Sequence, residues 1–222
     1  MWQRKRTTLA YSYISPLTIK LRATRPLTYA NKTMSGRSVY RGCALILGLP
    51  LLCWGNRVPP LVESGDLVFR TGDEAISSVI TSMDSSGFSH VGILYLDHQQ
   101  YYVIHATPAE HPGARDEVVV DTLEFFKARA KYHRVAYYHV SAPELAHRVA
   151  VNAALAQRGR PFSVLDARGI YCTELVDQAW AAAGYPLTQG RKTLHLPGAT
   201  VELILPQHLI ASPRLKNIAE TQ

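Results

Sequence analysis

Cysteine is scarce in this chain. The sequence has 222 residues and three cysteines, of which Cys43 and Cys53 lie in one short apolar run near the start. Cys172 is the single cysteine in the rest of the chain, so it has no partner there for an intramolecular disulfide. In an oxidising compartment an unpaired thiol must be buried or used in chemistry. The scarcity therefore excludes a disulfide-stapled body and draws attention to Cys172.

Acidic residues are absent from the first part of the chain. Residues 1–62 hold ten of the 24 Lys and Arg residues and none of the 17 Asp and Glu residues, since the first carboxylate is Glu63. The formal net charge of +7 thus belongs to the start of the chain, and residues 63–222 carry a net charge of about −3. Such a body offers no basic face to DNA or RNA, so nucleic acid is not expected as a partner.

No apolar run is long enough for a comfortable membrane span. A short basic stretch after Met34 is followed by the apolar residues Gly42–Trp54, whereas a spanning helix needs about 20 residues. This order predicts a secretory signal peptide or membrane anchor at residues 34–56, behind a basic extension or mis-assigned start at residues 1–33. A lipoprotein with Cys53 as the acylated residue fits less well, because Leu52 precedes it where a Gly, Ala or Ser is expected. We therefore expect export to the periplasm or cell envelope, with possible membrane association through this segment.

Residues 57–222 are predicted to form one α+β domain, with a small antiparallel sheet or half-barrel packed on helices at one side. Repeats and low-complexity tracts are absent. A helix beginning at Cys172 should bury Leu175, Val176, Ala179 and Trp180, which recur with helical spacing. The predicted strands are 67–70, 88–95, 101–106, 117–120, 135–140 and 201–205, the predicted helices are 74–84, 121–130, 141–157 and 172–183, and residues 206–213 are a predicted loop.

Three side chains could support nucleophilic chemistry: Cys172, His90 and His105. A helix N-terminus and a neighbouring imidazolium both lower a thiol pKa, so Cys172 at a helix start is expected to form a thiolate if His90 packs on that helix. His105 lies on the second strand of a predicted hairpin, within reach of His90, and could orient it. Each signal alone is weak, because a helix cysteine is usually a core residue and a strand histidine usually packs or lies at the surface.

A zinc site is a second interpretation of these residues, since two His and one Cys can hold catalytic zinc. Nothing in the spacing requires it, and no metal or other cofactor is expected.

Five motifs taken in order resemble the YiiX/YebB-like cysteine hydrolases, a circularly permuted branch of the NlpC-type papain-like superfamily related to lecithin:retinol acyltransferase-like proteins. The resemblance covers roughly residues 64–185, and Leu205–Pro213 is similar to a segment near the end of such chains. The motifs are Gly65-Asp-Leu-Val-Phe69, Phe88-Ser-His-Val-Gly-Ile93, Tyr102-Val-Ile-His-Ala106, Gly159-Arg-Pro-Phe162 and Tyr171-Cys-Thr-Glu-Leu-Val176.

The resemblance implies a circularly permuted papain-like (NlpC-type) fold in which the histidine precedes the cysteine. By position, Cys172 matches the nucleophile and His90 the general base. His105 falls where the family has its third polar residue, commonly a Glu and in some branches a His, so a neutral imidazole would replace a carboxylate here. The backbone N–H of Cys172 would contribute to an oxyanion hole, supported by Tyr171 and Ser89.

The predicted function is an exported cell-envelope cysteine hydrolase or acyltransferase. It would cleave an amide, ester or thioester bond of a cell-wall peptide or acylated lipid through an acyl-enzyme, so the expected partner is a small molecule, a lipid or a peptidoglycan fragment. Two alternatives remain: a catalytically weak lipid- or cell-wall-binding module with the same fold, and a structural membrane-anchored protein.

Overall fold

The computed structural model describes residue 59 and residues 61–166, 168–196 and 199–221. The predicted basic extension (1–33) and signal peptide or anchor (34–56) lie outside the described residues. Within the described ranges, no helix is long and apolar enough to cross a membrane.

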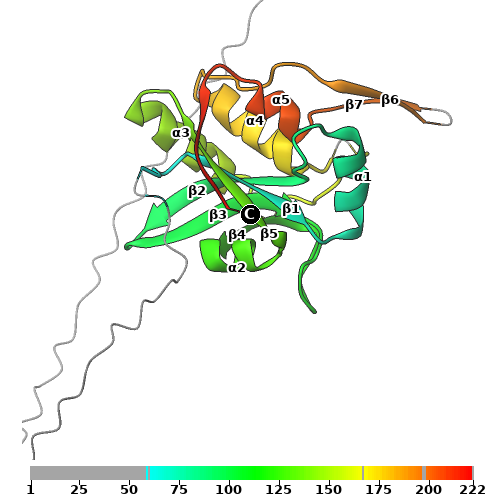
Figure 1. The fold of residues 1–222 in the computed structure, drawn as a ribbon, viewed down its shortest axis with the longest axis horizontal. Coiled ribbons are helices and arrows are strands. Elements are labelled where there is room, and N and C mark those ends of the chain that lie inside the picture. The colour runs from blue at the N-terminus through cyan, green and yellow to red at the C-terminus, as the bar shows by residue number, and fades with distance from the viewer. Residues whose placement is uncertain (1–58, 60, 167, 197–198, 222) are drawn as a thin grey trace, which may run out of the picture. The chain divides into compact units, whose positions relative to one another are not determined.

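A six-stranded antiparallel sheet forms the centre of the described domain, with strand order β4-β3-β2-β1-β5-β8 (Figure 1). A separate two-stranded hairpin of β6 and β7 extends from it. The strands are β1 (Leu67–Gly72), β2 (His90–Asp97), β3 (Gln100–Thr107), β4 (Glu117–Thr122), β5 (Ala130–Val140), β6 (Lys192–Leu196), β7 (Ala199–Leu203) and β8 (Leu215–Thr221). The helices are α1 (Ala75–Met83), α2 (Leu123–Ala128), α3 (Glu144–Leu155), α4 (Cys172–Ala182) and α5 (Pro206–Ile210).

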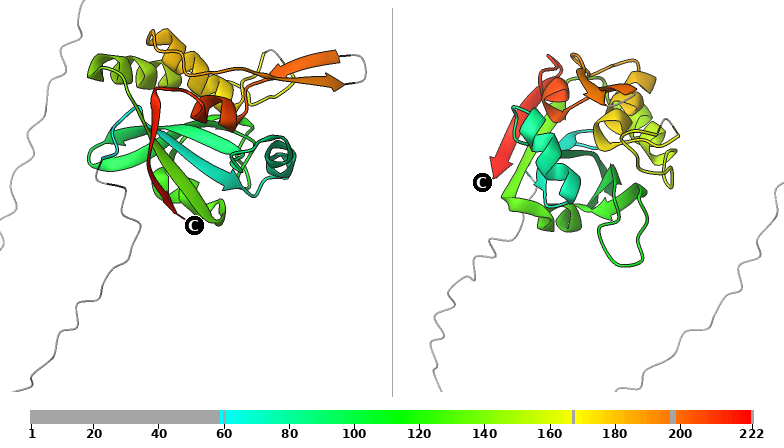
Figure 2. Two further views of the ribbon diagram at one scale, coloured as in Figure 1. Left: turned by 45° about the horizontal axis from the view of Figure 1, so that its top comes forward. Right: turned by 90° about the vertical axis from the view of Figure 1, so that its right-hand side faces the viewer.

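Strand β1 is buried on both faces of the sheet. Because side chains alternate along a strand, Leu67 and Phe69 enter one apolar core while Val68 enters the other. Helices α3 and α4 cover the first face, and α2 covers the second (Figure 2). The α4 side chains expected inside are all buried, including Trp180, which has no exposed surface. The α+β fold class predicted from the sequence, with an antiparallel sheet and packed helices, is thus observed.

Several local predictions were wrong. Helices lie on both faces of the sheet, because α2 buries Leu123 and Phe126 against the face opposite α4. The predicted loop at 206–213 contains α5, which starts at Pro206 and buries Leu209. Residues 215–221 form the edge strand β8. The sequence of β8 is polar and carries little strand signal, so its pairing with β5 supplies the structure.

Helix α1 uses its apolar stripe differently from a core helix. The helical spacing of Ile76, Val79, Ile80 and Met83 predicts that these four side chains face inward, yet Val79 is half exposed. Ile76 and Ile80 instead line a pocket beside the sheet. The helix therefore serves as a pocket wall, and this wall stands next to the start of α4.

Candidate active site

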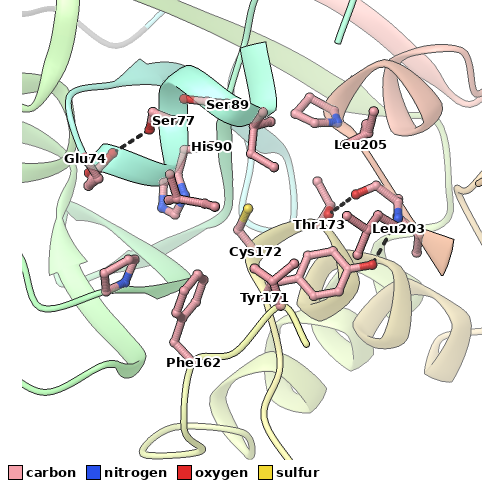
Figure 3. A pocket seen from close by; sticks show the side chains of 16 residues that line it. Glu74, Ser77, Ser89, His90, Phe162, Tyr171, Cys172, Thr173, Leu203 and Leu205 are labelled. Atoms are coloured by element: carbon pink, nitrogen blue, oxygen red, sulfur yellow. Dashed lines mark hydrogen bonds between the residues drawn. The ribbon is translucent and has the colours of Figure 1, made fainter. Parts of the chain in front are cut away.

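The pocket that contains Cys172 lies where α1, the start of β2, the start of α4 and the segment after β7 meet (Figure 3). It encloses about 500 Å³, counting space open to solvent. Most of its side chains are apolar. The lining residues are Glu74, Ile76, Ser77, Ile80, Ser89, His90, Pro108, Phe162, Val164, Tyr171, Cys172, Thr173, Leu203, Ile204, Leu205 and Pro206.

Cys172 is the first residue of α4, and Tyr171 precedes it in extended conformation. No side chain caps this helix, so its first N–H groups are free of the partner that a cap would provide. The backbone N–H groups of Val91 and Thr173 also lie at the thiol and lower its pKa. These donors create an electropositive corner around the sulfur.

Burial nevertheless dominates the ionisation of Cys172. Removal from water disfavours the thiolate and raises the pKa of the thiol to about 11, against the smaller effect of the two backbone donors. In this structure burial outweighs the helix start, and it opposes the thiolate that was expected from the sequence. The thiol is protonated near neutral pH and must lose its proton during any reaction.

His90 begins β2 and is buried beside the same pocket. Its burial and the positive charge of Arg70 both hold the pKa of the imidazole well below its usual range. The ring stacks on Phe126 of α2, with centroids 5.6 Å apart. His90 is therefore a neutral, fixed ring, able to accept a proton.

His105 lies on β3 directly beside His90. Its Nδ1 is 2.7 Å from Nε2 of His90, and the side chain has no exposed surface. Its Nε2 is 3.0 Å from Oδ2 of Asp121, at the end of β4. Burial lowers the pKa of His105, and the hydrogen bond that His105 donates to Asp121 opposes this shift. The structure thus joins the two histidines predicted from the sequence and adds a carboxylate that was missed.

Asp121 lies in strand β4 and not in the helix that was predicted to start at this residue. Residues 121–130 were predicted as a helix, but β4 continues to Thr122 and α2 starts at Leu123. The observed register places Val103 opposite Asp121 and His105 opposite Val119. Paired residues share a face of the sheet, so Asp121 is the diagonal neighbour of His105.

A second missed group is a buried charge cluster next to the histidines. Arg70 has no exposed surface, and its guanidinium donates to Glu74 at 2.6 Å, to Glu110 and to the backbone carbonyl of Phe126 at 2.9 Å. Burial favours protonation of both carboxyl groups, but the hydrogen bond they share and the charge of Arg70 lower the pKa of Glu74 to about 2. Burial and the same hydrogen bond raise the pKa of Glu110 to about 7.

The two residues next to Cys172, Tyr171 and Thr173, form hydrogen bonds to the backbone of Ile204, which also lines the pocket. The hydroxyl of Tyr171 accepts from the backbone N–H of Ile204 at 2.9 Å, and the hydroxyl of Thr173 donates to the carbonyl of Ile204 at 2.6 Å. Ser89 lies on the pocket and accepts from the N–H of Gly72 at 2.8 Å. Through these hydrogen bonds Tyr171 and Ser89 stabilise the backbone around the pocket. Their roles at an oxyanion hole stay predictions.

One group of described residues has donor atoms close enough for a cation: His105, Glu110 and Asp121, with one atom from each within 4.8 Å of the others. Both ring nitrogens of His105 already have partners. Glu110 bonds to Arg70 and lies 3.7 Å from Nε of Arg129, so two guanidinium groups oppose a cation there. The set considered from the sequence, His90, His105 and Cys172, does not form such a group in the described part of the chain.

Comparison with known proteins supports the fold that positions this pocket. A model of the permuted papain-like amidase enzymes, YaeF/YiiX, C92 family, matches residues 61–219. The crystal structure titled metalloprotein yiiX from Escherichia coli O157:H7 is similar with a TM-score of 0.62 at 18% identity, covering 72% of this chain and 97% of that chain. A search of curated proteins found no match.

The raised pKa of Cys172 predicts its reactivity with pH. Because only the thiolate is alkylated, the rate of Cys172 modification by iodoacetamide should increase about tenfold per pH unit between about pH 7 and 9, without a plateau. Peptide mass spectrometry of the full chain measures this rate separately from Cys43 and Cys53. A rate already constant across this range would instead show a preformed thiolate.

Proposed function

The chain belongs to the permuted papain-like amidase family and is a cysteine hydrolase, and we propose that it is an exported cell-envelope enzyme that cleaves acyl bonds through an acyl-enzyme on Cys172. The observation that carries the proposal is the pocket itself. It places a thiol at an uncapped helix start and a neutral, fixed imidazole on the same lining.

In the proposed reaction His90 takes the proton of Cys172 as the sulfur attacks the carbonyl carbon of an amide, ester or thioester. The sulfur–carbon bond forms, and the carbonyl electron pair moves onto oxygen. The N–H of Cys172 stabilises that oxyanion, since first-turn donors of a helix have no intrahelical acceptor. Collapse of the tetrahedral intermediate breaks the bond to the leaving group, which receives the proton from His90.

Water or another acceptor then attacks the acyl–sulfur bond, with His90 again taking and returning the proton. Release to water makes the protein a hydrolase, and release to another nucleophile makes it an acyltransferase. Both outcomes use the same residues. The choice between them depends on which acceptor reaches the acyl-enzyme.

The pocket walls favour an acyl chain over a cell-wall peptide as the group next to the scissile bond. Ile76 and Ile80 of α1 line the pocket together with Leu203 and Leu205. The charged lining residue Glu74 is already bound by Arg70. No lysine or arginine lines this pocket within the described residues, so a peptide carboxylate would find no cationic partner there.

Turnover of matched substrates tests this proposal. Lauroyl amides, esters and thioesters should be cleaved with kcat/KM at least about tenfold higher than the acetyl analogues, because buried methylenes add about 0.8 kcal/mol each. A peptidoglycan-derived peptide amide is the third substrate. Cys172→Ala should lower kcat by about 10³-fold or more.

Two results would contradict the proposal. Undiminished turnover by Cys172→Ala would exclude the nucleophile, and equal cleavage of acetyl and lauroyl substrates would exclude the acyl-chain assignment. Cys172→Ser, which keeps a small polar group at the position, serves as the matched control for folding.

The buried, protonated thiol of Cys172 specifically favours one other function, a lipid- or cell-wall-binding module with little catalysis. In that case the wild type would cleave none of these substrates. A lauroyl ligand would then raise the Tm of the wild type and of Cys172→Ala equally.

Export is the remaining part of the proposal, and it rests on the basic and apolar order of residues 34–56. The cell-envelope fraction should contain a protein whose N-terminus lies beyond this segment. N-terminal sequencing of that fraction measures it. A protein found with the segment intact in the cytosolic fraction alone would contradict export.

A further inference from the structure

Asp121 is the last side chain in a line of three hydrogen-bonded groups that starts at His90. The line runs from Nε2 of His90 to Nδ1 of His105 over 2.7 Å, and from Nε2 of His105 to Oδ2 of Asp121 over 3.0 Å. The three residues come from β2, β3 and β4, and these strands form one edge of the sheet (Figure 1). The two rings are buried, whereas the Asp121 side chain is 28% exposed.

The exposed side of Asp121 opens on a second hollow, away from the pocket that contains Cys172. Arg115, Glu117 and Arg158 line this hollow with Asp121. Of the described ion pairs, the one that includes Asp121 is with His105, while Arg115 pairs with Glu117. The carboxylate is therefore directed at the buried histidine even though two arginines lie along the same hollow.

The hydrogen-bond line determines where each proton sits. An ionised carboxylate only accepts, so Nε2 of His105 must carry a hydrogen. A neutral His105 then has a bare Nδ1, which must accept from an N–H at Nε2 of His90. A neutral His90 in turn has a bare Nδ1, and that nitrogen is the one position on the ring that can take a proton.

The opposite arrangement is unfavourable. If Nδ1 of His105 carried the hydrogen, its bare Nε2 would face the carboxylate of Asp121, and two acceptors would be paired in a buried site. Without the carboxylate, the hydrogen bond between the two rings favours neither the Nδ1–H nor the Nε2–H tautomer. The charge of Asp121 thus selects one tautomer for both rings.

The surroundings hold the rings in place but do not select the tautomer. Phe126 contacts both rings, stacked on His90 and edge-on to His105 at 5.2 Å. The charged groups near the rings are Arg70 of β1, Glu74 at the start of α1 and Glu110 of the β3–β4 loop. They influence the charge of the rings, and among the described residues none of the three forms a hydrogen bond to a ring nitrogen.

We propose that Asp121 is a positioning residue that fixes His90 and His105 in their Nε2–H tautomers, leaves Nδ1 of His90 free to act as the base, and stabilises the imidazolium that forms on His90. The effect on catalysis rests on the proposed function of Cys172. The tautomers themselves do not depend on it. His105 occupies the position of the third polar residue and brings no negative charge. Asp121 supplies that charge instead.

Nuclear magnetic resonance of the full chain labelled with nitrogen-15 histidine tests the tautomers directly. Long-range proton–nitrogen spectra should show hydrogen on Nε2 of both His90 and His105 in the wild type. Asp121→Asn removes the charge and keeps the shape, and its amide can offer either oxygen or nitrogen to His105. This variant should show a mixture of tautomers at both rings.

The same variant should lower kcat on a substrate that the wild type cleaves, with little change in KM. We expect about a 10²-fold loss, less than the loss of about 10⁴-fold known for a carboxylate directly bonded to a catalytic histidine. Asp121→Glu keeps the charge and should recover part of the activity. Glu117→Gln removes a charge from the same strand and hollow without a contact to either ring, so it should leave the tautomers and kcat unchanged.

Three results would overturn the inference. One is an Nδ1–H tautomer of His105 in the wild type, a result that stands even if Asp121→Asn fails to fold. Another is unchanged tautomers in a folded Asp121→Asn. The third is stoichiometric Zn²⁺ binding to the chelator-treated wild type that shifts the His105 signals and is lost in Asp121→Asn, because Asp121 would then be a metal ligand. Failure of all substrates would refute the proposed function and leave the tautomer result intact.

Discussion

A guanidinium with no exposed surface, that of Arg70, imposes the main constraint on this structure. A buried charge is tolerated when it is paired and hydrogen-bonded, and the partners of Arg70 come from separate segments: Glu74 at the start of α1, Glu110 of the β3–β4 loop, and the carbonyl of Phe126 in α2. The guanidinium carbon also lies 4.5 Å above the centroid of the Phe126 ring. The ion pairs and hydrogen bonds of Arg70 thus hold together the start of α1, the β3–β4 loop and helix α2. Phe126 of α2 packs on both histidines.

The same charge determines what kind of chemistry the pocket favours. Burial and the cation at Arg70 both disfavour an imidazolium at His90, and burial disfavours a thiolate at Cys172. The resting pair is therefore neutral, and charge develops only during attack on a carbonyl. The carboxylate of Asp121, reached through His105, balances the positive charge that His90 acquires. In the proposed reaction, helix-start N–H groups at Cys172 balance the negative charge on the substrate.

Much of this arrangement can be predicted from the sequence, because its signals are local. The apolar spacing of Leu175, Val176, Ala179 and Trp180 predicts the buried face of α4, and this placed Cys172 at a helix start. The remaining features depend on pairing between distant segments. Asp121 was assigned to a helix because the register of β4 cannot be read from composition, and Arg70 follows Phe69 in a strand where an arginine usually faces water. Strand β8 has a polar sequence, and its position comes from pairing with β5.

In the proposed reaction the sulfur of Cys172 attacks a carbonyl and carries the acyl group. Intact-mass spectrometry of the full chain, quenched in acid shortly after mixing with a lauroyl thioester, measures this most directly. If Cys172 carries the acyl group, the mass should increase by one lauroyl group on the peptide that contains Cys172. This increase should decay as product forms and be absent from Cys172→Ala. Product formation by the wild type without such an adduct, or the same adduct on Cys172→Ala, would show that Cys172 does not carry the acyl group.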